Sequence, residues 1–333
     1  MTGLFEPVTA VLAIPALAAA LLAALTAYRL TATLNVIATF LTFLAAVALF
    51  FGRPSPTPYL LVDDLNNVFI VLTTFVGFTT SVFSASYIGH ELEIGRLTPR
   101  FLRFYHAMYQ LLMFAMNLAL LANNIGIMWV AIELATLTTV LMVGIYRTHE
   151  ALEAAWKYFI LGSVGIALAL FGTILVYMAA RPVLGEGLNA MVWTVLVTRA
   201  GAFDPALLNV AFVFLLLGYG TKVGLAPLHA WLPDAHAEGP TPISAVLSGL
   251  LLNVALYALL RFKMLLALNP AALAPGPLMV TMGLISLVFA AFMLYRRRTS
   301  SACSPIRRSS IWASLPLPSA WAARLRTSPA SCT

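Results

Sequence analysis

The chain has 333 residues, of which 61% are hydrophobic and only 9% are charged, and its formal net charge is +7. Soluble domains are about 45–50% apolar and about 25% charged, so this composition excludes a soluble globular enzyme. The positive charge does not indicate nucleic acid as a partner. The residues before Arg296 are neutral overall, and the seven excess positive charges are the arginines between Arg296 and Arg326.

Nine apolar segments are long enough to cross a bilayer as helices, which requires about 20 residues each. Their ranges are 8–28, 31–51, 65–87, 105–122, 125–146, 154–180, 207–225, 243–264 and 278–295. Lipid cannot satisfy backbone polar groups, so these segments must be helical. The first segment follows no basic region and is longer than a signal-peptide core, so we expect a membrane span. The predicted fold is an all-α, polytopic transmembrane helix bundle.

Lysine and arginine residues beside the helix ends predict the orientation. Eight of them flank one side of the membrane and five flank the other side. The cytoplasmic side is the one richer in these residues. We therefore expect the N-terminus to lie outside, in a bacterial inner membrane.

An unpaired charge within a membrane span is costly and marks a functional site by default. Glu133 lies in the middle of the fifth span, Lys222 in the seventh, and Lys157 near the start of the sixth. Structural alternatives exist for each residue. Glu133 would be a neutral or helix-bonded carboxyl, and Lys222 would extend to the membrane surface from a helix end. Lys157 would pair with Glu153, one helical turn earlier.

Glu133 and Lys222 have the chemistry of a proton relay. Burial favours the neutral amine of a lysine, whereas a nearby carboxylate favours the ammonium. Approach or retreat of the carboxylate would therefore load or release a proton. Whether the two side chains meet does not follow from the sequence.

The residues after Lys222 predict an interrupted helix. Four prolines lie within residues 226–242, and a proline removes a helix hydrogen bond. Helix breakers beside an ionisable group are typical of an interrupted helix that lines a polar cavity. His229 and His236 are candidate proton carriers near neutral pH, or else loop histidines that cap helix ends. Their spacing with Asp234 matches no helical ligand pair, so no metal site is expected.

The stretch Lys222–Pro242 closely resembles the signature of antiporter-like proton-translocating membrane subunits. Such subunits occur in respiratory complex I (NADH–quinone oxidoreductase), in multisubunit sodium/proton antiporters and in membrane-bound hydrogenases. The segment from Tyr87 to Tyr109 is most similar to the hydrogenase-4 component F branch. The resemblance covers about residues 1–298.

The resemblance implies fourteen transmembrane helices in two inverted five-helix repeats, with the seventh and twelfth helices broken, and no cofactor bound by this subunit. It implies that Glu133 is the essential acid of the fifth helix, Lys222 the lysine of the broken seventh helix, and Lys157 the sixth-helix lysine. Many relatives carry a lysine in the eighth helix, where this chain has Asn253. An amide orders water but cannot carry an extra proton, so transfer past this position would need water or a histidine.

The implied function is proton translocation driven by redox chemistry in partner subunits. The implied partners are other membrane subunits and a peripheral arm that resembles a nickel–iron hydrogenase or a quinone-reducing module. Two alternatives remain open, namely a cation/proton antiporter subunit and an inactive truncated scaffold.

The composition changes abruptly after Arg298 to serine, proline, arginine and alanine without helical periodicity, and both cysteines, Cys303 and Cys332, lie there. Codons compatible with residues 299–313, read one frame over, can encode a peptide that resembles the family segment after the ninth helix. We therefore predict a transmembrane domain at 1–298 and a non-native tail at 299–333 that is out of frame or disordered. A frame change would remove the last five helices, so the chain as written is predicted not to pump protons.

Overall fold

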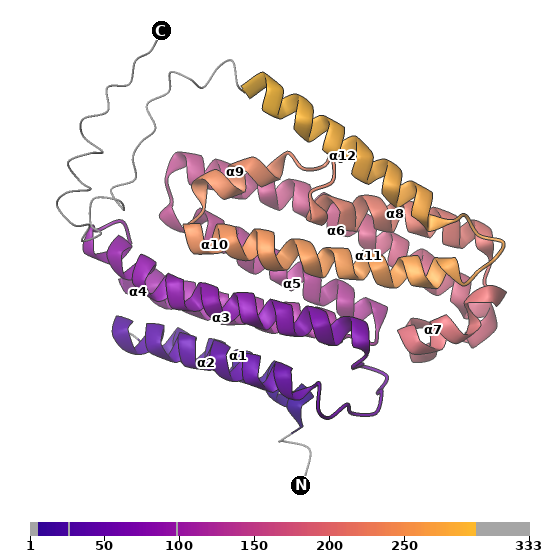
Figure 1. Cartoon of the computed structure of the whole chain (residues 1–333), viewed down its shortest axis with the longest axis horizontal. Coiled ribbons are helices and arrows are strands. Elements are labelled where there is room, and N and C mark those ends of the chain that lie inside the picture. Colours follow the sequence, from indigo (N-terminus) through magenta and orange to yellow (C-terminus); the bar gives the residue numbers. More distant parts are fainter. Residues whose placement is uncertain (1–5, 26, 98, 298–333) are drawn as a thin grey trace. The chain divides into compact units, whose positions relative to one another are not determined.

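The computed structural model describes residues 6–25, 27–97 and 99–297, and this part of the chain is built from helices (Figure 1). The α-helices are α1 (Pro7–Ala24), α2 (Tyr28–Ala48), α3 (Asp64–Glu93), α4 (Pro99–Leu121), α5 (Ile125–Val143), α6 (His149–Leu184), α7 (Trp193–Arg199), α8 (Pro205–Val223), α9 (Trp231–Glu238), α10 (Thr241–Val246), α11 (Leu252–Ala267) and α12 (Pro275–Arg297). A π-helical turn, Leu247–Leu251, joins α10 to α11. The predicted all-α fold is confirmed. The domain boundary and the tail predicted at 299–333 lie outside the described residues.

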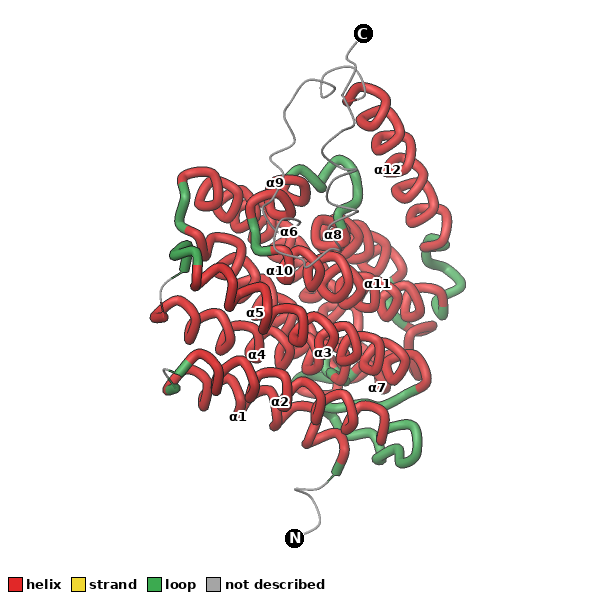
Figure 2. Tube along the Cα trace, turned by 60° about the vertical axis from the view of Figure 1, so that its left-hand side comes forward, coloured by secondary structure: helices red, strands yellow, loops and turns green. Residues whose placement is uncertain are grey.

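Nine helical segments within the described residues are long and apolar enough to cross a membrane, as the sequence predicts. Their ends differ from the predicted ranges. The third span extends to Glu93, so His90 and Glu91 belong to α3 rather than to the following connection. The eighth span combines α10, the π-helical turn and α11 as Thr241–Ala267. The connections lie at the helix ends (Figure 2).

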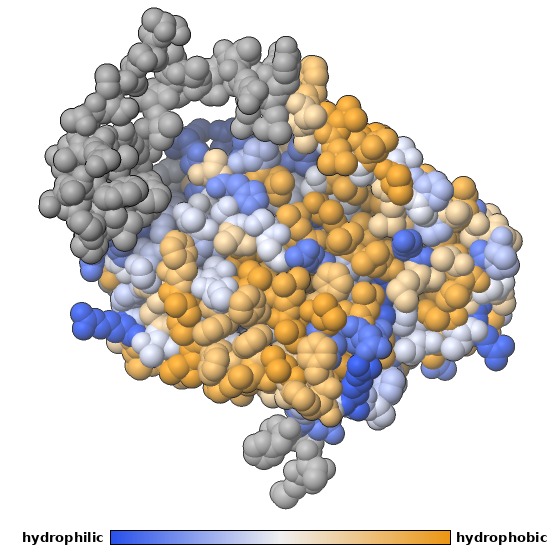
Figure 3. Space-filling model, in the orientation of Figure 1, coloured by the Kyte–Doolittle hydropathy of each residue, from blue (hydrophilic) through white to orange (hydrophobic). Residues whose placement is uncertain are grey.

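Besides an apolar core, the helices bury many polar side chains and leave many large apolar side chains exposed. On α2, Thr31, Asn35 and Thr39 are buried, whereas Ile37 and Phe40 are exposed. Apolar surface covers most of the face where α2 and α3 lie (Figure 3). This arrangement suits lipid, because hydrocarbon solvates apolar side chains and leaves polar ones to be satisfied within the bundle.

Polar residues begin several of the long helices. Asp63, Asn124 and Thr148 occupy the N-cap positions of α3, α5 and α6, and each side chain accepts a hydrogen bond from a first-turn backbone N–H. Such caps satisfy donors that have no partner within the helix. Short polar sequences between apolar runs therefore set where these spans start.

Glycines allow α6 and α8 to pack at close range. A Cβ atom on Gly218 would lie 2.5 Å from the backbone nitrogen of Ala169 and 2.6 Å from the carbonyl oxygen of Gly165. Small residues at helix interfaces permit such approach in membranes. The contact holds the end of α8, with Lys222, against α6.

A buried ion pair ties α11 to the start of α3. The Arg261 guanidinium donates to both carboxylate oxygens of Asp63, at 2.6 and 2.8 Å, and its Nε donates to the Tyr257 hydroxyl at 2.8 Å. The guanidinium also lies 4.2 Å from the ring centroid of Trp193, the first residue of α7. The Arg261 side chain is 3% exposed and that of Asp63 is 31% exposed. Bidentate geometry and the cation–π contact compensate much of the desolvation of the charge.

Neighbouring aspartates offer a matched test of this pair. Asp63→Asn keeps an N-cap side chain but leaves the Arg261 charge uncompensated, which we expect to lower the free energy of unfolding by about 3 kcal/mol. Asp64 pairs with Arg53 at the surface, so Asp64→Asn is expected to cost less than about 1 kcal/mol. Denaturant unfolding in detergent micelles measures both changes. Equal losses for the two variants would contradict the assignment.

Candidate proton-transfer site

Lys222 lies in the last turn of α8 and is held inside the bundle. The helix ends there because Gly224 adopts a left-handed backbone conformation, with φ of 79°. The chain then turns into α9, where the Trp231 indole N–H donates to the Thr221 carbonyl oxygen at 2.8 Å. The predicted interruption after the seventh span is therefore present. The Lys222 side chain is fully buried and does not extend to the membrane surface.

Residues of α6 form the surroundings of the Lys222 ammonium. The nitrogen lies 5.7 Å from the ring centroid of Tyr158, within the range of a cation–π contact. A Cβ atom on Gly162 would lie 2.8 Å from this nitrogen, so the absence of that side chain makes room for the ammonium. The Tyr158 ring stacks on Trp231 with centroids 4.5 Å apart. The turn into α9 thus fixes one wall of the lysine site.

Glu133 is the acidic group that interacts with Lys222. It projects from α5, is partly buried, and its charge interacts with that of Lys222. Among the described side chains, Glu133 Oε2 and Lys222 Nζ are both buried without a hydrogen-bond partner. No direct ion pair, with nitrogen and oxygen within 4.0 Å, joins them in the described part of the chain. The two groups therefore interact electrostatically without a direct ion pair.

Lys157 lies in a different environment. Its ammonium is 2.7 Å from Glu153 and 3.0 Å from Asp234 on α9, and its side chain is 48% exposed. The ion pair with Glu153, the structural alternative for this lysine, is present. Asp234, which is distant in the sequence, adds a second contact. The structure does not bring this ammonium into the buried site. It links α6 to α9 at the surface.

The remaining predicted residues follow the broken helix. His229 lies in the turn between α8 and α9, and His236 lies on α9, with Nδ1 2.5 Å from the Ser244 hydroxyl of α10. Burial lowers the pKa of the His236 imidazole. Asn253 lies on α11, where its amide donates to the Gly249 carbonyl oxygen at 2.6 Å. That carbonyl belongs to the π-helical turn, so the amide compensates a local irregularity of the helix.

Sequence reasoning missed the residues that shape the site. Tyr158, Gly162 and Trp231 carry no charge at neutral pH and act by packing around Lys222 and against each other. The pair Gly162 and Gly165 within one span is the signal that could have been found, since closely spaced small residues mark helix contacts in membranes.

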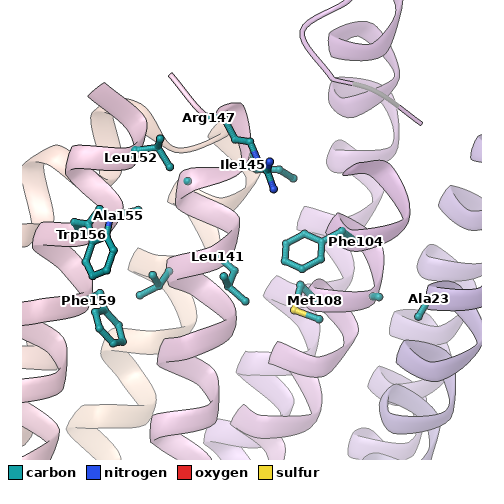
Figure 4. A pocket seen from close by; sticks show the side chains of 13 residues that line it. Ala23, Phe104, Met108, Leu141, Ile145, Arg147, Leu152, Ala155, Trp156 and Phe159 are labelled. Atoms are coloured by element: carbon teal, nitrogen blue, oxygen red, sulfur yellow. The ribbon is translucent and has the colours of Figure 1, made fainter. Parts of the chain in front are cut away.

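A large groove lies apart from this site. A groove of about 1000 Å³ runs between α4, α5 and α6 and is lined mainly by apolar side chains, including Phe104, Leu141 and Trp156, with Arg147 at one end (Figure 4). Leu141 and Trp156 are 50% and 61% exposed. A groove that is apolar and open on the outside of a membrane bundle is a place for hydrocarbon chains, not for proton chemistry.

The low pKa of His236 predicts how the α9–α10 turn responds to pH. Because burial lowers the pKa below its ordinary value of 6.5, the opened chain binds a proton more readily than the folded one. The stability of this turn is therefore full above that value and is lost as the pH falls below it. We expect faster backbone hydrogen exchange in residues 231–244 at about pH 5 than at about pH 7.5, after correction for intrinsic rates.

His236→Gln removes the titrating group and should abolish this difference. His149→Gln, at the exposed start of α6, is the control and should leave it unchanged. A pH response that survives in His236→Gln would assign the effect to another group.

Comparison with known proteins shows the family to which this chain belongs. The family described as "NADH:quinone oxidoreductase/Mrp antiporter, TM" matches residues 122–299, more than half of the chain. The hydrogenase-4 component F homolog of Methylacidiphilum infernorum (isolate V4) is 63% identical over 289 residues, which are 87% of this chain and 61% of that protein. The chain thus spans less than two thirds of the length of this relative.

Solved structures show the same fold. A chain of the membrane-bound sulfane sulfur reductase, an archaeal respiratory membrane complex, aligns with a TM-score of 0.70 and 22% identity over 83% of this chain and 57% of its own length. A chain of respiratory complex I from Thermus thermophilus aligns with a TM-score of 0.61 and 24% identity, over 76% of this chain and 52% of its own length. The resemblance predicted from the broken-helix signature is confirmed: the chain is an integral membrane protein of the NADH:quinone oxidoreductase/Mrp antiporter transmembrane family.

Proposed function

We propose that this chain is a proton-translocating membrane subunit of a redox-driven complex, hydrogenase-4-like or NADH–quinone oxidoreductase-like. The observation that carries the proposal is the pair of buried groups, Glu133 and Lys222, which interact without a direct contact beside an interrupted helix. A carboxylate that moves toward the ammonium stabilises the bound proton, and one that moves away favours its release. The relative named as a hydrogenase-4 component F homolog supports the redox branch.

The proposal divides the work between subunits. This chain binds no redox cofactor and moves protons, while a peripheral arm like a nickel–iron hydrogenase or a quinone-reducing module carries the electrons. Other membrane subunits flank it in a bacterial inner membrane, with the N-terminus outside. Lys157, His229 and His236 follow the buried pair toward the surface, and water ordered by Asn253 takes the place of a further lysine.

A cation/proton antiporter subunit is the second candidate. The family description joins quinone oxidoreductases with Mrp antiporters, and a buried carboxylate can release a proton in exchange for a sodium ion. Sodium-dependent proton movement in the absence of an electron donor would favour this candidate. Proton movement that requires electron transfer and is indifferent to sodium favours the redox-driven subunit.

Substitution of the buried pair tests the proposal in membranes that contain the complex assembled with a full-length subunit that carries these residues. Because each group is needed to hold or release the proton, Glu133→Gln and Lys222→Ala should each lower electron-driven proton uptake by about tenfold or more. Glu150→Gln, at the exposed start of α6, and Lys263→Ala, on α11, are the controls and should retain uptake. Assembly is monitored by copurification of the subunits, and wild-type uptake in an assembled Glu133→Gln complex would refute the role of this acid.

The space beside Gly162 gives a second test. In Gly162→Ala the new Cβ atom would lie 2.8 Å from the Lys222 ammonium, which is the flexible end of a side chain and can shift. We expect proton uptake to fall while the unfolding temperature stays close to that of the wild type. In Gly218→Ala the clash at 2.5 Å is with the backbone of α6, so that variant should lose about 1–3 kcal/mol of stability. Unchanged uptake in Gly162→Ala would show that the ammonium position is not critical.

A further inference from the structure

One face of α4 contains buried polar side chains that the proposed proton relay does not use. His106, Gln110 and Asn117 are all fully buried. Their spacing of four and seven residues places them on the same side of the helix. This side packs against α1 and α2, since Gln110 contacts Asn35 of α2 and Asn117 contacts the Val11 carbonyl oxygen of α1.

These side chains are only partly satisfied. The Gln110 amide donates to the backbone and side-chain oxygens of Asn35 at 3.1 and 2.9 Å, while Asn117 makes a single long contact of 3.5 Å. The imidazole of His106 lies among aromatic rings, with centroids 6.3 Å from Tyr28 and 5.3 Å from Tyr105. Seven buried polar atoms have no hydrogen-bond partner among the described residues in this part of the bundle, namely Asn35 Nδ2, Asn67 Oδ1, Asn67 Nδ2, His106 Nδ1, His106 Nε2, Gln110 Oε1 and Asn117 Oδ1.

A dry interior cannot hold this group of atoms. Each buried polar atom without a partner costs about 1–3 kcal/mol, so seven of them would cost about 7–21 kcal/mol. This cost equals or exceeds the usual free energy of unfolding of a protein, about 5–15 kcal/mol. Direct pairing across helices is the usual solution in membranes, and the nearby contacts Thr39–Ser81 and Ser84–Tyr105, both 2.7 Å, show it. The atoms on the α4 face lack such contacts, although both donors and acceptors are present.

Bound water can form hydrogen bonds with these unpartnered donors and acceptors. A buried water makes about three hydrogen bonds to polar groups that are otherwise unsatisfied. The Asn35 amide nitrogen donates, the Gln110 and Asn117 oxygens accept, and a neutral imidazole does one of each. From His106 to Asn117 the helix rises by about 16 Å, roughly half of the hydrocarbon core of a bilayer.

The His106 end of this face continues in polar groups toward the surface. Tyr105, next to His106, bonds Ser84 of α3. Further along α3, the Tyr87 hydroxyl lies 3.4 Å from that of Tyr146, and Glu91 is 3% exposed with one carboxylate oxygen unpartnered. The other Glu91 oxygen is 3.5 Å from the exposed guanidinium of Arg96.

We propose that α1–α4 enclose a file of bound water molecules that runs from Asn117 past Gln110 to His106 and opens toward Glu91. The ligand is water, and the titratable group in contact with it is the His106 imidazole. This hydrated seam uses none of the groups of the Glu133–Lys222 site. It gives the N-terminal four helices a second polar path, distinct from the proposed relay.

Radiolytic hydroxyl-radical labelling tests the proposal, because the radicals form from water next to the side chain that they oxidise. Met113 lies on the same side of α4 between Gln110 and Asn117 and is 1% exposed, while Met142 on α5 is 0% exposed and has no unpartnered polar neighbour on its own helix turn. In the wild-type chain in lipid nanodiscs, we expect Met113 to be labelled about fivefold faster than Met142 or more, because of bound water beside it. Equal labelling of the two methionines would overturn the proposal.

Apolar substitutions locate the water. Gln110→Leu and Asn117→Leu remove the acceptors and fill their volume, so labelling of Met113 should fall to the rate of Met142. Asn209→Leu, the same change on α8, and Glu133→Gln should leave Met113 labelling unchanged. A Met113 rate that persists in both α4 variants would show that the seam does not hold the water. If a variant does not fold, the comparison of the labelling rates of Met113 and Met142 in the wild type still tests the proposal.

Deuterium exchange at the imidazole C2 position provides an independent readout at His106. Exchange of the hydrogen on this carbon requires access of the ring to water from the solvent. We expect His106 to exchange at a measurable rate in the wild type and about tenfold more slowly in Gln110→Leu, where exchange waits for local opening of the helices. The exposed His149 serves as the internal reference in the same sample.

Discussion

The close approach of α6 and α8 is the constraint on which the site depends. The backbones meet where Gly218 faces Gly165 and Ala169, at a range that no Cβ atom would tolerate. That contact sets the distance from the end of α8 to α6, and so it decides that the Lys222 ammonium lies beside Gly162 and Tyr158 rather than in lipid. In a membrane, where apolar burial drives helix association weakly, such packing carries much of the specificity. The lysine position is therefore a consequence of missing side chains on the opposite helix.

The two lysines of this region show how environment decides the role of one residue type. Lys222 has no hydrogen-bond partner in the described part of the chain and interacts with Glu133 from a distance. Lys157 has two carboxylates within 3.0 Å and nearly half of its side chain exposed. Two carboxylates favour the ammonium of Lys157 and tie α9 to α6, whereas a buried lysine with one distant carboxylate responds to movement of that carboxylate. In the proposed function, Lys157 would keep the broken helix in place while the protonation of the Lys222 site changes.

Buried polar groups in this bundle fall into two classes. Threonines and serines on α2 and α3 bond to their own helix or to a neighbour, as Thr39 and Ser81 do, and they stiffen the packing. The amides and the imidazole on the α4 face are larger groups with more donors and acceptors than the neighbouring helices satisfy. Hydration of this face would give the bundle a polar path at α4 that is separate from the Glu133–Lys222 site.

The sequence by itself determined the number of spans, the break after Lys222 and the identity of the buried acid and lysine. These are local properties: about twenty apolar residues in a row, prolines directly after a span, and charged residues within an apolar run can each be interpreted without knowledge of the neighbouring helices. Only the tertiary structure decided that Lys157 meets Asp234, which is 77 residues away, that Gly162 makes room for Lys222, and that His106 is enclosed with unpartnered nitrogens. The physical reason is that nearly uniform apolarity hides which side of a helix faces which neighbour. Helix contacts in the membrane depend on small residues and shape, so the partners of a buried polar group appear only when the helices are packed.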